Sequence, residues 1–157
     1  MLAMLILLIF LNVILSSSYA VKHDPNILCR TCGNNILKAS DIISKESPSS
    51  LYSFNDTIFN EESSLVQILR REVIFQFTIV TSNQSNCIGF GEWEKEELWF
   101  PGYHWKPCLC PECGDIIGWL FENHNPEQTY TFNRFYALIL PNLLSEKVLQ
   151  SLISYPV

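Results

Sequence analysis

The sequence is poor in positive charge. Ten of its 157 residues are Lys or Arg, against sixteen Asp or Glu, which gives a net charge of −6 at neutral pH. The basic residues are scattered along the chain and form no patch or stripe of the kind that binds phosphate backbones or anionic headgroups. Nucleic acids and anionic lipid surfaces are therefore poor candidates as partners.

Long apolar runs are also scarce, and the single one lies at the start of the chain. Residues 1–15 are almost wholly apolar, and small and polar residues follow up to Ala20. This pattern predicts a secretory signal peptide over residues 1–20, because the run is short for a membrane-spanning helix. An uncleaved signal anchor is the alternative. We expect one secreted domain over residues 21–157, monomeric and without membrane attachment after cleavage.

The six cysteines divide into two knuckles and one leftover pair. Each knuckle is a C-x-x-C sequence followed by Gly, and two such knuckles can supply four thiolates to one tetrahedral zinc ion. The predicted zinc ligands are Cys29, Cys32, Cys110 and Cys113. Two separate disulfides are the alternative in an exported chain. Four cysteine ligands leave no open position for water, so the zinc would be structural.

The leftover cysteines are Cys87 and Cys108. In an oxidising compartment the simplest expectation is one disulfide between them, and two buried free thiols are the alternative. Two sequons, at Asn55 and Asn83, are candidate N-glycosylation sites on surface loops of an exported chain.

The remaining pattern is that of a mainly β, antiparallel domain. Strands are predicted over residues 65–69, 73–80, 117–122 and 130–140, loops over 44–53 and 81–86, and a short amphipathic helix over 142–153. Arg70-Arg71-Glu72 is either the turn between the first two strands or a charged bend in one long strand. Residues 36–43 fit a strand or a helical turn equally well.

Three of the four tryptophans lie close together between residues 98 and 121. On composition alone, tryptophans of a small β domain are best explained as core residues. Their arrangement changes that balance. Trp99-Phe-Pro-Gly-Tyr-His-Trp105, then the second knuckle, then Ile117-Gly-Trp-Leu-Phe121 closely resembles the CULT family, the thalidomide-binding domains of cereblon-type proteins. The resemblance covers about residues 27–145.

Membership of that family would imply a β-tent, in which two antiparallel sheets are pinned by the four-cysteine zinc site. Trp99, Trp105 and Trp119 would form three walls of an aromatic cage, with Phe121 as its base or fourth wall. The family's ligands are cyclic imides such as glutarimides, including thalidomide-type compounds and C-terminal cyclic imides of peptides, and also uracil-like rings. Backbone groups that map to Glu97 and Trp99 would bind the imide.

Two departures from the family limit what the resemblance implies. Glu97 stands where cereblon has His, and neighbouring glutamates make the approach to the cage acidic, which favours neutral or cationic ligands. We also expect no ubiquitin-ligase receptor function from this chain, because it has no room for the additional domain that this function needs.

Other functions fit the same residues less well. Methionine sulfoxide reductases of the B type share the β-tent and its zinc cysteines, but they need a further nucleophilic cysteine late in the chain, which is missing here. The three histidines are scattered and suggest no hydrolytic site. We therefore expect a binding protein rather than an enzyme. Binding of methylated ammonium groups or of a protein partner through the tryptophans stays open as an alternative.

Overall fold

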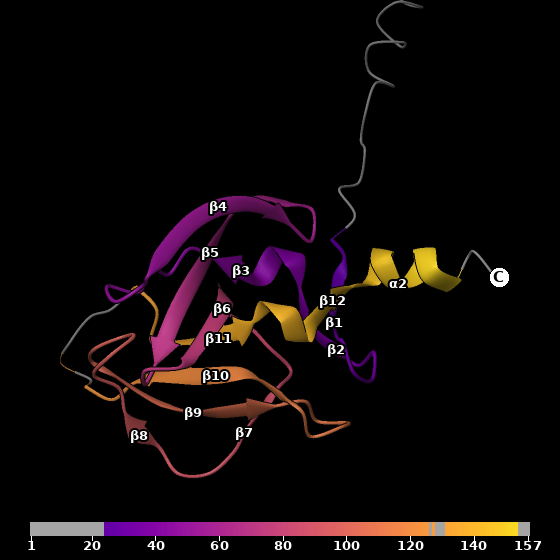
Figure 1. Cartoon of the computed structure of the whole chain (residues 1–157). Coiled ribbons are helices and arrows are strands. Elements are labelled where there is room, and N and C mark those ends of the chain that lie inside the picture. The colour runs from indigo at the N-terminus through magenta and orange to yellow at the C-terminus, as the bar shows by residue number, and fades with distance from the viewer. Residues whose placement is uncertain (1–23, 126, 128–130, 154–157) are drawn as a thin grey trace, which may run out of the picture.

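The computed structural model describes residues 24–125, 127 and 131–153 (Figure 1). The expected signal peptide lies outside these residues, as does the first residue of the strand predicted over 130–140. The described part contains two antiparallel sheets, so the predicted mainly β fold with two antiparallel sheets is confirmed. None of its helices is long and apolar enough to cross a membrane.

The smaller sheet joins the two ends of the described chain. It consists of β1 (Asn26–Cys29), β2 (Asn35–Lys38) and β12 (Leu143–Ser145), in the order β12-β1-β2. Ile27 pairs with Ser145 on one side and Leu37 on the other. The short helix α2 (Glu146–Ile153) follows β12 directly and continues away from this sheet (Figure 1).

The larger sheet has the strand order β4-β5-β6-β11-β10-β9-β7, with β3 paired to β6 and β8 paired to β9. Its strands are β3 (Ile42–Ile43), β4 (Tyr52–Ile58), β5 (Glu61–Arg71), β6 (Phe75–Ser82), β7 (Ile88–Gly89), β8 (Glu94–Lys95), β9 (Tyr103–Leu109), β10 (Ile116–Asn123) and β11 (Arg134–Ile139). Two 3-10 turns, at Ala39–Asp41 and Leu140–Asn142, connect elements at its margin.

Side chains alternate between the two faces of the larger sheet, and each face buries its own hydrophobic cluster. Leu120 and Leu138 point into a cluster that also contains β1, β2 and Cys108. Trp119 and Phe121, their neighbours on the opposite face, belong to a second cluster rich in aromatic rings. The first cluster joins the two sheets, and the second holds the candidate tryptophan cage.

Three local predictions from the sequence need correction or refinement. The helix expected over 142–153 begins only at Glu146, because residues 143–145 pair with β1 instead. Residues 70–72, predicted as either a turn or a charged bend in one long strand, are divided between strand and turn: Arg71 still pairs with Phe75 at the end of β5, and the turn lies at 72–74. The loop expected over 44–53 ends at β4, an exposed edge strand that the sequence pattern did not reveal. Residues 36–43 form both a strand and a 3-10 turn.

Candidate functional site

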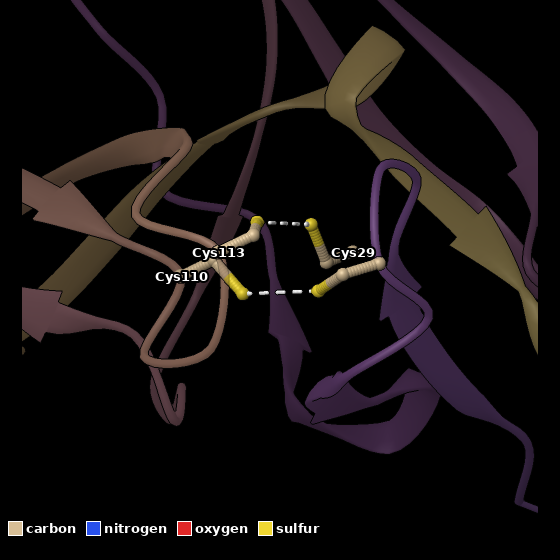
Figure 2. A group of neighbouring side chains, drawn as sticks. Cys29, Cys110 and Cys113 are labelled. Carbon is tan, nitrogen blue, oxygen red and sulfur yellow. Dashed lines mark hydrogen bonds between the residues drawn. The ribbon is translucent and has the colours of Figure 1, made fainter.

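The two cysteine knuckles face one another across the junction of the two sheets (Figure 2). Each has the same backbone scheme, since Gly33 N–H donates to the carbonyl of Cys29 and Gly114 N–H donates to that of Cys110. Both glycines have positive φ angles, 77° and 76°, which residues with a Cβ rarely adopt. Glycine follows each knuckle because the backbone there adopts a conformation that other residues rarely take.

The four thiols have the spacing of a tetrahedral metal site. Cys29 Sγ lies 3.7 Å from Cys113 Sγ, and Cys32 Sγ lies 3.6 Å from Cys110 Sγ. All four sulfur atoms lie within 4.8 Å of one another. A zinc ion with Zn–S bonds of about 2.3 Å requires sulfur atoms about 3.8 Å apart, so the cluster fits zinc closely.

The chemistry of Cys110 also suits a metal ligand. Burial acts to raise the pKa of its thiol, but hydrogen bonds from the backbone N–H groups of Cys113 and Glu112 and contacts with the thiols of Cys32 and Cys113 together lower the pKa to about 7. For Cys113 the balance is opposite, because a backbone hydrogen bond at Asp115 is outweighed by burial and by the neighbouring thiols, which raise its pKa to about 12. Cys110 therefore loses its proton readily near neutral pH, and the thiolate is the form that binds metal. Asn34 Nδ2 donates a further hydrogen bond, 3.9 Å long, to the same sulfur.

The second knuckle is also the turn between β9 and β10. These strands carry Trp105 and Trp119, so a metal bound by the knuckle would fix the hairpin on which two of the candidate cage residues stand.

The Cys87–Cys108 disulfide predicted from the sequence is present and ties the segment before β7 to β9. Both sulfurs are in buried residues.

The three tryptophans come together on the aromatic face of the larger sheet. Trp119 and Phe121 are two residues apart on β10, so their side chains lie on the same face of the sheet. Trp105 on β9 is paired with Phe121, and its side chain therefore lies on that face too. Trp99 comes from the loop before β9 and packs edge-to-face on Trp119, with ring centroids 4.8 Å apart. Its exposed fraction is 0%, that of Trp119 is 5%, and Trp105 is half-buried.

Phe121 lies deeper in the same aromatic cluster. Its ring stacks on Phe135 with centroids 5.0 Å apart and meets Phe100 edge-to-face at 4.9 Å. Phe77 of β6 also packs on two of the tryptophans, with its ring centroid 4.9 Å from that of Trp119 and 6.0 Å from that of Trp99. Phe77 was not singled out from the sequence, because a phenylalanine in a strand gives no signal of its own.

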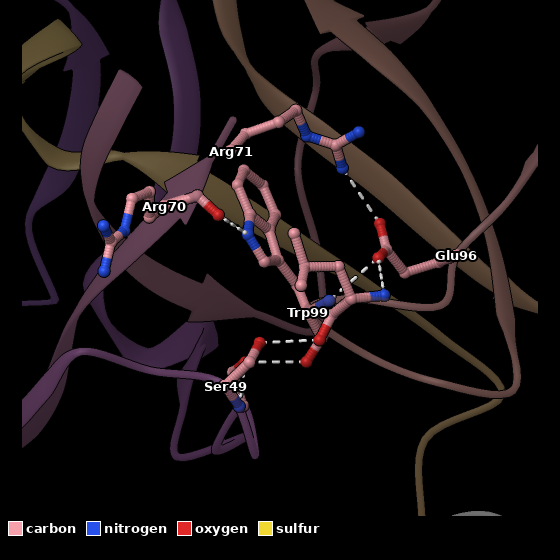
Figure 3. A network of polar contacts seen from close by, with 7 residues as sticks. Ser49, Arg70, Arg71, Glu96 and Trp99 are labelled. Carbon is pink, nitrogen blue, oxygen red and sulfur yellow. Dashed lines mark hydrogen bonds and ion pairs between the residues drawn. The ribbon is translucent and has the colours of Figure 1, made fainter. Parts of the chain in front are cut away.

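A network of polar contacts fixes the loop that carries Trp99 (Figure 3). Ser47 Oγ donates to the Trp99 carbonyl and Ser49 Oγ to the Leu98 carbonyl, each over 2.6 Å. The indole Nε1–H of Trp99 donates to the Arg70 carbonyl over 2.8 Å. The loop before β4 thus clamps the first tryptophan, although the sequence showed in it only a serine-rich loop.

Glu96 is the buried acid of this network, with an exposed fraction of 3%. Its Oε1 accepts hydrogen bonds from the backbone N–H groups of Leu98 and Trp99, at 2.6 and 2.8 Å. Its Oε2 accepts from Arg71 Nη2 at 3.0 Å, and the Arg71 guanidinium lies against the rings of both Trp99 and Trp105. Neither Glu96 nor Arg71 was predicted to belong to the site.

Glu97, the predicted backbone contact, lies at the edge of this arrangement. Its side chain is exposed and pairs with Lys95 over 2.6 Å, which lowers the pKa of the Glu97 carboxyl. The N–H and the carbonyl of Trp99 are already bonded to Glu96 and Ser47. An imide in this site would therefore find the Trp99 backbone groups engaged.

The comparisons with known proteins point to one group. The chain is 26% identical over 109 residues to protein cereblon of Drosophila mojavensis, and 26% identical over 111 residues to that of Drosophila melanogaster. It is 27% identical over 120 residues to protein cereblon of Drosophila simulans, which is 74% of this chain. Over this stretch the chain is cereblon-like.

The cereblon-like region is a small part of those relatives. It covers 14% of the Drosophila mojavensis protein, 16% of the Drosophila melanogaster protein and 18% of the Drosophila simulans protein. No protein-family model matches the chain. The similarity therefore concerns one cereblon-like region, and the functions of the whole relatives are a separate matter.

Proposed function

We propose that this protein is a CULT-type binding domain whose tryptophan cage, formed by Trp99, Trp105 and Trp119, takes a small cyclic imide, a glutarimide or a uracil-like ring. The observation that carries the proposal is that these three tryptophans meet on one face of the sheet in a cereblon-like chain. Flat indole faces suit a small planar ring. Thalidomide-type compounds and C-terminal cyclic imides of peptides are the expected ligands.

The cysteine cluster would hold one structural zinc ion through Cys29, Cys32, Cys110 and Cys113. With four thiolate ligands the ion would stabilise the fold and take no part in chemistry. The remaining two cysteines form the disulfide, so none of the six is left as a free nucleophile outside the cluster. This supports a binding protein over a reductase of the methionine sulfoxide type.

The proposal includes export from the cell, with cleavage after residue 20 and action as a secreted monomer. The disulfide supports export, since such bonds persist in oxidising compartments. Asn55 and Asn83 are both exposed, as glycosylation requires, although Asn55 lies in strand β4 rather than in the expected loop. Expression of the full chain in animal cells, with the medium assayed before and after glycan removal, tests both points.

The binding test is a titration of the zinc-loaded protein with glutarimide, followed by tryptophan fluorescence. We expect saturable quenching, and a much weaker response to N-methylglutarimide, which lacks the imide N–H donor. Trp105→Ala should abolish the response, and this variant is preferred to one at Trp119 because Trp105 is only half-buried. The matched control is Trp93→Ala, since Trp93 packs with the first hydrophobic cluster. Equal binding by the Trp105 variant would contradict the proposal.

A second candidate is a cationic ligand such as a methylated ammonium group. The guanidinium of Arg71 already rests against two of the indole rings, with Glu96 beside it, so the site as built accommodates a cation. Titration with trimethyl-lysine under the same conditions distinguishes the two ligand classes. Tighter binding of trimethyl-lysine than of glutarimide would favour this candidate.

A further inference from the structure

Arg71 is a charged side chain that lies against two rings of the tryptophan cage. It is the last residue of β5, and its guanidinium carbon lies 4.5 Å from the ring centroid of Trp99 and 4.4 Å from that of Trp105. These are distances of direct contact between a cation and an aromatic face. Figure 3 shows the guanidinium beside the Trp99 ring, where it also meets Glu96. Arg71 therefore lies on the ring faces that a flat ligand would use.

Glu96 holds Arg71 in this position. The ion pair is 3.0 Å long, and the side chain of Glu96 is only 2% exposed, against 30% for Arg71. The other carboxylate oxygen of Glu96 is fixed by two backbone N–H groups of the Trp99 loop. The anchor for Arg71 is thus part of the structure that carries the first tryptophan.

The contact is incomplete in one respect. The Nε atom of Arg71 is buried and has no hydrogen-bond partner among the described residues. A buried donor without a partner opposes the arrangement that buries it. Arg71 is also followed by the exposed turn at residues 72–74, in which Val73 is 84% exposed. Arg71 thus lies at the end of its hairpin that faces solvent. If its side chain left the site, water would bind the Nε–H that has no partner inside it.

We propose that Arg71 is an internal occupant of the tryptophan cage, and that an external ligand binds by displacing it. This inference rests on the proposed function, because it concerns the same site. Binding then exchanges the Arg71 contacts for ligand contacts, so Arg71 weakens the affinity for any neutral ring. Displacement of Arg71 also leaves Oε2 of Glu96 without its cation. A ligand that presents an N–H or an ammonium group to Glu96 is therefore favoured over one that does not.

Arg70 provides a matched control within the same strand. Its side chain is exposed, and only its backbone carbonyl takes part in the site, as the acceptor of the Trp99 indole N–H. An Arg70→Gln variant therefore loses the same charge as Arg71→Gln and keeps the contact to Trp99. Arg71→Gln loses the cation but retains an N–H group that can reach Glu96.

The experiment combines affinity with a direct signal from Arg71. Glutarimide is titrated by calorimetry into the zinc-loaded wild type, Arg71→Gln and Arg70→Gln proteins, each checked for zinc content and melting temperature. In parallel, the Nε–H signals of the arginines are followed by NMR in the wild type. We expect Arg71→Gln to bind about tenfold more tightly, which corresponds to about 1.4 kcal/mol, and Arg70→Gln to bind as the wild type does.

The NMR signal supplies the independent evidence. In the free wild type the Nε–H of Arg71 should be shifted upfield by the two indole rings, and saturation with glutarimide should move it to the value of an exposed arginine. If Arg71→Gln does not fold, Arg71→Lys replaces it, because lysine keeps a charge for Glu96 but lacks the flat guanidinium.

The outcomes separate this inference from the proposed function. Binding of glutarimide with unchanged affinity in Arg71→Gln and an unmoved Arg71 signal would overturn the inference and leave the function standing. Weaker binding by Arg71→Gln would also overturn it, because Arg71 would then be a wall that contacts the ligand. Absence of glutarimide binding in all three folded proteins would overturn the proposed function, and the displacement with it.

Discussion

The Cys87–Cys108 disulfide closes a loop that contains Trp93, Trp99 and Trp105. The two cysteines are 21 residues apart in the sequence. The β7 strand after Cys87 is only two residues long, so the covalent bond reinforces a short backbone pairing where this loop begins. The perturbation we consider is the double substitution Cys87→Ala and Cys108→Ala.

The magnitude follows from the length of the loop. In the chain-entropy account, releasing a loop of this length in the unfolded state lowers the free energy of unfolding by about 3 kcal/mol at 25 °C. Both cysteines are buried, with exposed fractions of 8% and 0%, so the loss of their sulfur atoms adds to this figure rather than offsetting it. A loss of this size in a domain of this length lowers the melting temperature by roughly 10 °C.

The assay is unfolding by guanidinium chloride at a fixed excess of zinc, with the oxidised wild type and the double variant compared. We expect the free energy of unfolding to fall by about 3 kcal/mol in the reduced wild type, which keeps its sulfur atoms, and by somewhat more in the double variant. A loss below about 1 kcal/mol, with the same dependence on denaturant, would refute the reasoning, because the loop would then be held by other contacts.

Three further predictions concern the sheet, the metal and the pH dependence. Gly118→Ala should prevent folding, because a Cβ there would overlap the backbone carbonyl oxygen of Ala137 in β11. At Gly89 an added Cβ would meet only side-chain atoms of Lys106 and Leu120, so Gly89→Ala should fold; circular dichroism distinguishes the two. Elemental analysis should find one zinc per chain in the wild type and none in Cys113→Ser, which should also unfold more easily. Burial, and then the charges of His124 and Lys95, lower the pKa of His104 below its usual 6.5, so the unfolded state binds the proton better. The melting temperature should therefore fall as the pH drops below about 6.5, and less so in His124→Asn; an equal fall in both proteins would count against a role for the stacked pair.

The sequence was sufficient to predict how the six cysteines are arranged. Two C-x-x-C-Gly knuckles are recognisable from spacing alone, and the structure brings their four sulfurs together. Once the knuckles were set aside, Cys87 and Cys108 could pair only with each other, and the structure contains this disulfide. Clustering of the three tryptophans followed from a family pattern rather than from hydrophobic periodicity. These predictions depended on residue types whose chemistry is restrictive.

The parts that escaped prediction depend on tertiary contacts between common residue types. Arg71 sits in a charged run that resembles a solvent-exposed turn, and its place against the tryptophans follows from a strand that continues to pair up to that residue. Glu96 is one of four glutamates between residues 92 and 97, and only the fold determines which of them is buried. Ser47 and Ser49 belong to a loop whose sequence does not name the carbonyls that it binds.

The most direct test of the central claim is a two-dimensional NMR spectrum of the indole N–H groups of the wild type protein, recorded with and without saturating glutarimide. Four signals are expected, one for each tryptophan. The account predicts that the signals of Trp99, Trp105 and Trp119 shift together and saturate at a single ligand concentration, while that of Trp93 stays in place. Four unmoved signals in a folded, zinc-loaded protein, or a shift of Trp93 alone, would contradict it.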